Sequence, residues 1–243
     1  MRGVLVLVAA AAAVPTAAEA GRTQYGWLYG TEVMPERGAE VQTWVAEENG
    51  KPPNDLHDTT LWWGALVGVT DRLELAFPVE MLWRQVDGDD PSFTVNRFGV
   101  EARYRFVSSD PVEAPKLAPL VRIAVKRDVT ARERVRAEVD LVASYRSGRF
   151  HALIDLGAIA ELGRDASHFE VRPGAGISVA IAGELRLGAE VYAELSADDE
   201  RESWAVVGPN LAWTHGRFWL SAAFGIGIYQ IDTAPRFVWG IMF

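Results

Sequence analysis

The chain ends with the stretch Pro235-Arg236-Phe237-Val238-Trp239-Gly240-Ile241-Met242-Phe243. In an extended strand, successive side chains point to opposite faces. One face of this stretch is therefore apolar and aromatic, with Phe237, Trp239, Ile241 and Phe243. The other face carries Arg236, Val238, Gly240 and Met242. Chain ends usually fray into polar tails, so an alternating aromatic end predicts a strand that is paired in a sheet.

The same alternation recurs between residues 39 and 243. It forms about twelve segments, which are separated by turn-forming residues. Residues 97–106 show it most clearly, because Arg, Gly and Glu alternate with Phe, Val, Ala and Tyr. A helix, with a period of about 3.6 residues, would spread these arginines around its whole circumference. The segments are about nine to thirteen residues long, near the length that a tilted membrane strand needs. The sequence therefore predicts an all-β fold, a transmembrane antiparallel up-and-down β-barrel of about twelve strands.

The N-terminal residues predict export. Arg2 precedes an apolar run over residues 4–14, and Ala18-Glu19-Ala20 fits the cleavage site of a secretory signal peptide. We therefore expect residues 1–20 to be removed and residues 39–243 to form the barrel. Residues 21–38 lack alternation and are expected to be a periplasmic lead-in or a segment in the barrel mouth. The chain has no cysteine, so packing or a membrane must stabilise it instead of disulfides.

Alternation alone does not decide which face of the barrel points outwards. Soluble barrels have apolar residues inside, and membrane barrels have them outside. In this chain, aromatic residues gather at both ends of the apolar face, while Val, Leu, Ile and Ala fill its middle. Two aromatic girdles around an aliphatic band are typical of a barrel in a bilayer. The predicted girdle consists of Trp83, Phe93, Tyr104, Phe106, Tyr145, Phe150, Phe169, Trp213, Phe218, Phe237 and Phe243.

Short turns alternate with longer polar loops along the chain. Outer-membrane barrels have this asymmetry, with short periplasmic turns and long extracellular loops. Nearly all of the net charge of −9 lies in the longer loops, and a net negative charge disfavours nucleic acid as a partner. We therefore expect a protein of the Gram-negative outer membrane, surrounded by lipid and lipopolysaccharide.

Charged residues of the strands fall on the face opposite the girdle, so they are predicted to line the lumen. They are Glu74, Glu80, Arg84, Arg97, Glu101, Arg103, Arg105, Arg122, Lys126, Arg134, Arg136, Glu138, Asp140, Arg172, Arg186 and Glu190. One interpretation is a basic wall with acids across the lumen, in a passive channel for small polar or anionic solutes. The alternative is that the charges pair into a network that fills a closed barrel with a structural or surface-interaction role.

A lipid hydrolase with a Ser–His pair on the barrel rim is a third and weaker hypothesis. The histidines are His57, His151, His168 and His215, and none is predicted on the apolar face beside a serine. His151 is expected to face water beside Asp155. With scattered histidines and no cysteine, the sequence predicts no metal site, no cofactor and no enzymatic activity.

Two stretches resemble known outer-membrane barrels. Residues 235–243 resemble their closing strand, whose terminal Phe is recognised by the barrel assembly machinery. Residues 31–44, Thr-Glu-Val-Met-Pro-Glu-Arg-Gly-Ala-Glu-Val-Gln-Thr-Trp, resemble the first strand of barrels assigned to the MetA pathway of phenol degradation and of related uncharacterised families. The resemblance implies a transport-type barrel, with the assembly machinery and small solutes as partners. It supplies no catalytic residues.

Overall fold

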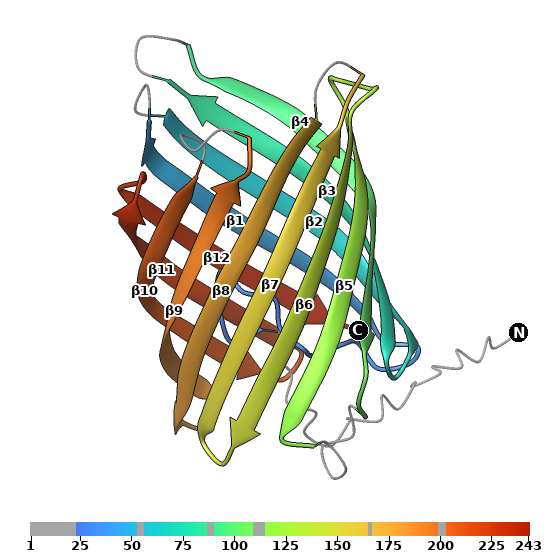
Figure 1. The fold of residues 1–243 in the computed structure, drawn as a ribbon. Coiled ribbons are helices and arrows are strands. Elements are labelled where there is room, and N and C mark those ends of the chain that lie inside the picture. The colour runs from blue at the N-terminus through green and yellow to red at the C-terminus, as the bar shows by residue number, and fades with distance from the viewer. Residues whose placement is uncertain (1–22, 53–55, 87–89, 109–114, 165–166, 199–202) are drawn as a thin grey trace, which may run out of the picture.

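The computed structural model describes residues 23–52, 56–86, 90–108, 115–164, 167–198 and 203–243. The predicted signal peptide, residues 1–20, lies outside this part of the chain. Twelve antiparallel strands form one closed barrel in which each strand pairs with its neighbours in sequence (Figure 1). The strands are β1 (Ala39–Lys51), β2 (Leu56–Thr70), β3 (Leu73–Gln85), β4 (Ser92–Arg105), β5 (Leu117–Asp128), β6 (Val135–Ser147), β7 (Phe150–Leu162), β8 (Ser167–Ala182), β9 (Leu185–Ser196), β10 (Trp204–His215), β11 (Phe218–Tyr229) and β12 (Thr233–Met242). The predicted fold class is confirmed.

The stretch that ends the sequence closes the barrel as β12. It pairs with β11 on one side and with β1 on the other, where Val45 lies opposite Phe237 and Val41 opposite Ile241. Closure leaves no strand edge unpaired, which a barrel in lipid requires. Within the described residues, no helix is long and apolar enough to cross a membrane.

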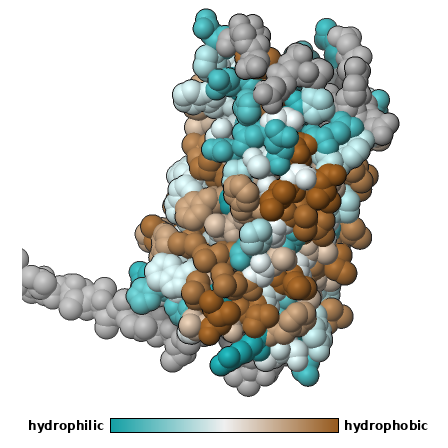
Figure 2. Space-filling model, turned by 90° about the vertical axis from the view of Figure 1, so that its left-hand side faces the viewer, coloured by the Kyte–Doolittle hydropathy of each residue, from teal (hydrophilic) through white to brown (hydrophobic). Residues whose placement is uncertain are grey.

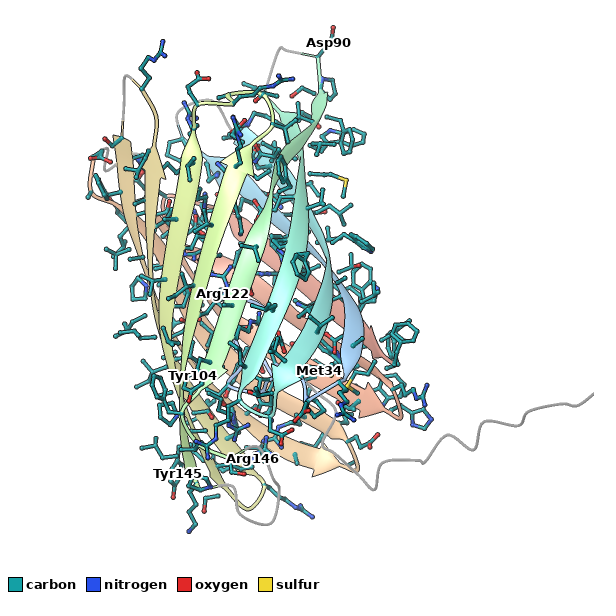
Figure 3. All side chains as sticks on the ribbon, turned by 90° about the vertical axis from the view of Figure 1, so that its right-hand side faces the viewer. Met34, Asp90, Tyr104, Arg122, Tyr145 and Arg146 are labelled. Atoms are coloured by element: carbon teal, nitrogen blue, oxygen red, sulfur yellow. The ribbon has the colours of Figure 1, made fainter. Side chains whose placement is uncertain are left out.

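Tight turns join several strands at one end of the barrel. Gly148 and Gly216 have φ values of 57° and 58° at the β6–β7 and β10–β11 turns. Glycine adopts this left-handed conformation without the steric cost that a Cβ atom brings. These turns lie at the end where the C-terminus emerges, and Asp90 lies at the opposite end (Figures 1 and 3).

The outer face of the barrel is apolar. Aliphatic side chains such as Ile123, Leu141 and Ile154 are more than half exposed, and Figure 2 shows apolar residues over the wall between more polar ends. Of the predicted girdle residues, Phe218 is half-buried. The exposed ones are Trp83, Phe93, Tyr104, Phe106, Tyr145, Phe150, Phe169, Trp213, Phe237 and Phe243. An apolar exterior around a charged interior is the reverse of a soluble barrel, so the outer face contacts lipid.

Candidate functional site: the barrel lumen

Arg122 on β5 lies at the centre of a network of ion pairs inside the barrel (Figure 3). Its guanidinium lies 2.6 Å from Glu101, 2.8 Å from Glu138 and 2.5 Å from Asp140. These carboxylates come from β4 and β6, the strands on either side of β5. Arg122 is fully buried, and a buried charge needs such partners because it has lost its hydration.

The network extends from Arg122 towards the end of the barrel that carries the longer loops. Lys126 contacts Glu80 at 2.5 Å and Glu138 at 2.9 Å, and Arg136 contacts Glu161 at 2.9 Å. Its basic members are Arg97, Arg103, Arg122, Lys126, Arg136 and Arg172, and its acidic members are Glu74, Glu80, Glu101, Glu138, Asp140 and Glu161. Acids and bases are equally numerous, so their formal charges cancel.

Of the two arrangements that the sequence left open, a basic wall with acids across the lumen differs from the structure, whereas paired charges are present. The antiparallel register places Arg122 directly beside Asp140 on the next strand. Glu101 reaches the same guanidinium from the preceding strand. The acids are therefore interleaved with the arginines on one side of the barrel, because adjacent strands carry both signs at matching heights.

Residues 23–38, which we call the inner segment, lie near the end with the tight turns, with residues 23–34 inside the barrel and residues 35–37 exposed (Figure 1). Carboxylates of the wall accept hydrogen bonds from its backbone. Glu190 accepts from Gly26 N–H at 2.9 Å and from Trp27 N–H at 3.0 Å. Asp155 accepts from Tyr29 N–H at 2.9 Å. These contacts satisfy backbone donors that would otherwise be buried without partners.

Side chains of the inner segment also contact the wall. The Thr31 hydroxyl lies 2.6 Å from the hydroxyl of Ser144, and Trp27 stacks on Tyr192 with the ring centroids 5.1 Å apart. The end of the segment continues directly into β1. The inner segment is thus packed against several strands of the barrel.

His151 belongs to this packing. Sequence reasoning placed it in water beside Asp155, and this prediction is wrong. Its side chain is buried, and Nδ1 lies 3.0 Å from the hydroxyl of Tyr25. The aromatic contact comes from a residue 126 positions earlier in the chain, so the alternation of β7 alone could not reveal it.

Above the inner segment, the lumen opens into a cavity of about 720 Å³, which we call the vestibule. Trp27 and Tyr29 lie on its inner side, and its walls carry charges from most strands, among them Glu48, Asp58, Arg97, Arg134 and Glu194. It extends towards the longer loops. The vestibule is large enough for a small solute and is predominantly polar.

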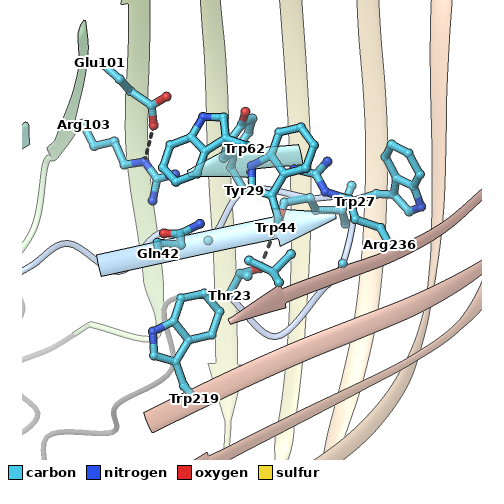
Figure 4. Close-up of a pocket in the computed structure, with 14 residues that line it drawn as sticks. Thr23, Trp27, Tyr29, Gln42, Trp44, Trp62, Glu101, Arg103, Trp219 and Arg236 are labelled. Atoms are coloured by element: carbon cyan, nitrogen blue, oxygen red, sulfur yellow. Dashed lines mark hydrogen bonds and ion pairs between the residues drawn. The ribbon is translucent and has the colours of Figure 1, made fainter. Parts of the chain in front are cut away.

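A much narrower space, which we call the slit, lies between the inner segment and residues of β11, β12, β1, β2 and β4 (Figure 4). Its volume is about 20 Å³, room for roughly one water molecule. Its lining consists of Thr23, Gly26, Trp27, Leu28, Tyr29 and Gly30 from the inner segment and Gln42, Trp44, Trp62, Glu101, Arg103, Trp219, Arg236 and Val238 from the wall.

The remaining predicted lumen residues lie at several heights. Arg84 makes two hydrogen bonds of 2.8 Å to Asp58, and Arg134 lines the vestibule. Arg105 is buried at the end of β4, and Arg186 lies near the β8–β9 turn. In the part of the chain that the structure describes, no three His, Asp or Glu side chains form a group that could hold a metal ion.

Sequence reasoning missed the aromatic lining of the lumen. Trp44 and Trp62 point inwards and stack with their centroids 6.3 Å apart, and both line the slit. Both tryptophans alternate with the lipid-facing residues of their strands. This position in the sequence pattern could have predicted that they point into the lumen. Space for the inner segment comes from glycines. A Cβ atom at Gly176 would collide with Tyr25, and one at Gly174 would collide with Leu28.

Comparison with known proteins identifies the fold. No protein-family model matches the chain, and no curated protein matches its sequence. The structure is similar to that of an outer membrane channel from Pseudomonas putida F1, with a TM-score of 0.60 and 10% identity over 88% of this chain and 98% of that one. It is also similar to the NanC porin, with a TM-score of 0.55 and 9% identity over 84% of this chain and 98% of that one.

A third similar structure is the translocator domain of the autotransporter NalP from Neisseria meningitidis. Its TM-score is 0.54 at 13% identity, over 85% of this chain and 88% of that one. None of these is a MetA-pathway protein by name, so that resemblance stays a prediction. The chain therefore has the fold of outer-membrane β-barrels, with twelve strands and an apolar, lipid-facing exterior.

Proposed function

We propose that this barrel is a passive channel for small polar solutes, including small anions. The observation that supports it most is the polar vestibule of about 720 Å³, which leads to the slit beside the inner segment. The similar structures include proteins named as a channel and as a porin, and the proposal extends that role to this chain. The proposed transport is passive and assigns no catalytic role to any residue.

Planar-bilayer conductance tests the proposal, with the full chain compared to a variant that lacks residues 21–38. Small ohmic steps with anion preference are expected from the full chain. Larger steps are expected from the variant, because the inner segment no longer fills one end of the lumen. If neither protein gives conductance steps, in preparations shown to be folded, the proposed channel function is wrong.

A closed barrel with a structural or surface-interaction role is the second candidate. The observation that favours it is the ion-pair network around Arg122, which fills one side of the lumen while the inner segment fills one end. The same conductance measurement separates the two candidates, since a closed barrel gives no steps even when residues 21–38 are absent.

The proposal includes how the chain reaches the membrane. Residues 1–20 act as a cleaved signal peptide, and the assembly machinery recognises β12 together with Phe243, which is 70% exposed. Lipopolysaccharide and lipid surround the girdles. Removing Phe243 should lower the amount of folded barrel in cells and leave refolding in detergent unchanged, because this side chain makes little contact with the barrel. An equal loss of folded barrel in cells and in detergent would mean that Phe243 is needed for folding and not for recognition by the assembly machinery.

A further inference from the structure

The two sides of the lumen differ in how they are filled. On the side of β4, β5 and β6, paired charges surround Arg122 and leave it fully buried. On the side of β11, β12, β1 and β2, the slit lining is aromatic, apolar or uncharged apart from Arg236, as at Trp44, Trp219 and Val238. The slit lies mainly on this second side, and its lining also includes Glu101 and Arg103 of β4. A solute moving through the first side would have to break several ion pairs at once, each costly to separate when buried.

The slit begins where the vestibule ends. Four residues line both spaces, namely Trp27, Tyr29, Trp44 and Arg236. From there the slit passes Gln42 and Trp219 towards the end with the tight turns. The two spaces therefore follow one another along the barrel and form a single candidate route.

Several buried polar atoms on this side have no hydrogen-bond partner within the described part of the chain. They include the side-chain oxygen Oε1 of Gln42, which lines the slit, and the Oγ atom of Ser221 on the neighbouring strand β11. Gln42 is 6% exposed and Ser221 is fully buried. Buried polar groups are nearly always paired with protein or with ordered water. This wall is thus suited to water and to polar solutes.

Arg236 lies at the junction of vestibule and slit. Its guanidinium carbon is 5.1 Å from the ring centroid of Trp27 and 4.2 Å from that of Trp44 (Figure 4). The other charged residues of the slit, Glu101 and Arg103, pair with each other at 3.0 Å. Among the charged residues of the slit lining, Arg236 is therefore the one not paired with another lining residue, and its guanidinium lies between a tryptophan of the inner segment and one of the wall.

We propose that solutes cross the barrel along the β11–β12–β1–β2 wall through the slit, and that Arg236 at its mouth sets a preference for anions. This inference rests on the proposed channel function. It places the route beside the ion-pair network and not through it, because guanidiniums such as those of Arg122 and Arg172 already lie beside carboxylates. A positive charge at the mouth of the narrow slit attracts anions and repels cations more strongly than charges in the wide vestibule do.

The absence of cysteine allows a direct test of the route. Val238→Cys places a thiol in the slit, and Ala124→Cys places one within the ion-pair network on the opposite side, at an equally buried position. Each refolded variant is treated in planar bilayers with an anionic, membrane-impermeant methanethiosulfonate. Val238→Cys is expected to lose most of its current on treatment. Ala124→Cys and the cysteine-free chain are expected to keep theirs.

Arg236→Gln tests the charge at the mouth of the slit. Under a salt gradient, its reversal potential should shift towards that of a non-selective pore, and Arg236→Lys should restore most of the selectivity. Arg132→Gln is the matched control, because it removes the same charge from an exposed loop position outside the lumen lining.

The outcomes are separable. Block of Val238→Cys together with the shift in Arg236→Gln supports the inference. A conducting channel in which Ala124→Cys is blocked and Val238→Cys is not overturns the route and leaves the channel function intact. A reversal potential equal in Arg236→Gln and in the unsubstituted chain overturns the role of Arg236. No current from folded, unsubstituted protein overturns the channel and the route together.

Discussion

At the scale of single residues, the lumen contains buried charges that depend on one another. Substitution of one of them leaves its partners without a counter-charge. Arg122 lies among three carboxylates and also stacks on Tyr29, with its guanidinium carbon 4.1 Å from the ring centroid. A buried ion pair is not strongly stabilising in itself, because both partners have lost their hydration. Removing one partner, however, leaves the others buried and uncompensated.

Arg122→Ala should therefore lower the free energy of unfolding by about 3–5 kcal/mol. The exposed Arg132 provides the control, and Arg132→Ala should cost less than about 1 kcal/mol. Urea unfolding of both variants in lipid vesicles, followed by tryptophan fluorescence, measures the difference. A similar small loss in both variants would mean that water reaches the network and hydrates its carboxylates.

Glu190 holds the inner segment through two backbone N–H groups. Glu190→Ala leaves both donors buried without this acceptor, at about 1–3 kcal/mol for each unsatisfied group. We expect faster hydrogen exchange at Gly26 and Trp27 and a larger single-channel conductance. The control is Glu184→Ala in an exposed turn, which should change neither. Unchanged exchange in Glu190→Ala would show that other contacts hold the inner segment.

At the scale of the strand, one face contacts lipid and the other faces the polar lumen. On the lipid face, the free-energy cost of a charged side chain depends on its position along the strand. Ile123 lies near the middle of β5 and Leu117 at its start, and both side chains are more than half exposed on the outer face. The middle of the strand lies in hydrocarbon, whereas its start lies beside the interface, where a long side chain can reach water.

Ile123→Arg should accordingly cost about 2–4 kcal/mol, and Leu117→Arg about 0–1 kcal/mol. Unfolding in lipid vesicles measures both on the same strand and the same face. Equal costs would mean that the apolar band is displaced along the barrel from the position assigned by its girdles.

At the scale of the whole molecule, passage of a solute requires the inner segment to move relative to the barrel. The slit has room for about one water molecule, so anything larger needs it to widen. The Thr31 and Ser144 hydroxyls, 2.6 Å apart, connect the inner segment to β6. This pair is a suitable position for a reversible covalent link, because neither residue lines the slit.

In the double variant Thr31→Cys and Ser144→Cys, oxidation should suppress current carried by ions larger than water, and a thiol reductant should restore it. Each single variant is the control and should not respond to either reagent. Bilayer recordings before and after reduction measure the effect. Full current in the oxidised double variant would mean that solutes pass without displacement of this part of the inner segment.

Features that depend on local periodicity follow from the amino-acid sequence alone. Alternation with a period of two predicts the strands, and the aromatic ends of one face predict that this face contacts lipid. It also predicts that residues such as Arg122 and Glu138 share the inner face. Each of these properties can be determined from a few consecutive residues, because the solvent on each side of the wall differs so strongly.

The filling of the lumen, in contrast, depends on how distant parts of the chain come together in the folded barrel. The strand register brings Glu101 and Asp140 beside Arg122, and so decides for an interleaved network between the two arrangements that the sequence left open. The inner segment gave no periodic signal, and its contacts, such as that between Tyr25 and His151, join residues 126 positions apart. Such contacts depend on which side chains the closed barrel brings close together. Hydrophobic periodicity along the sequence carries no information on which distant residues become neighbours in space.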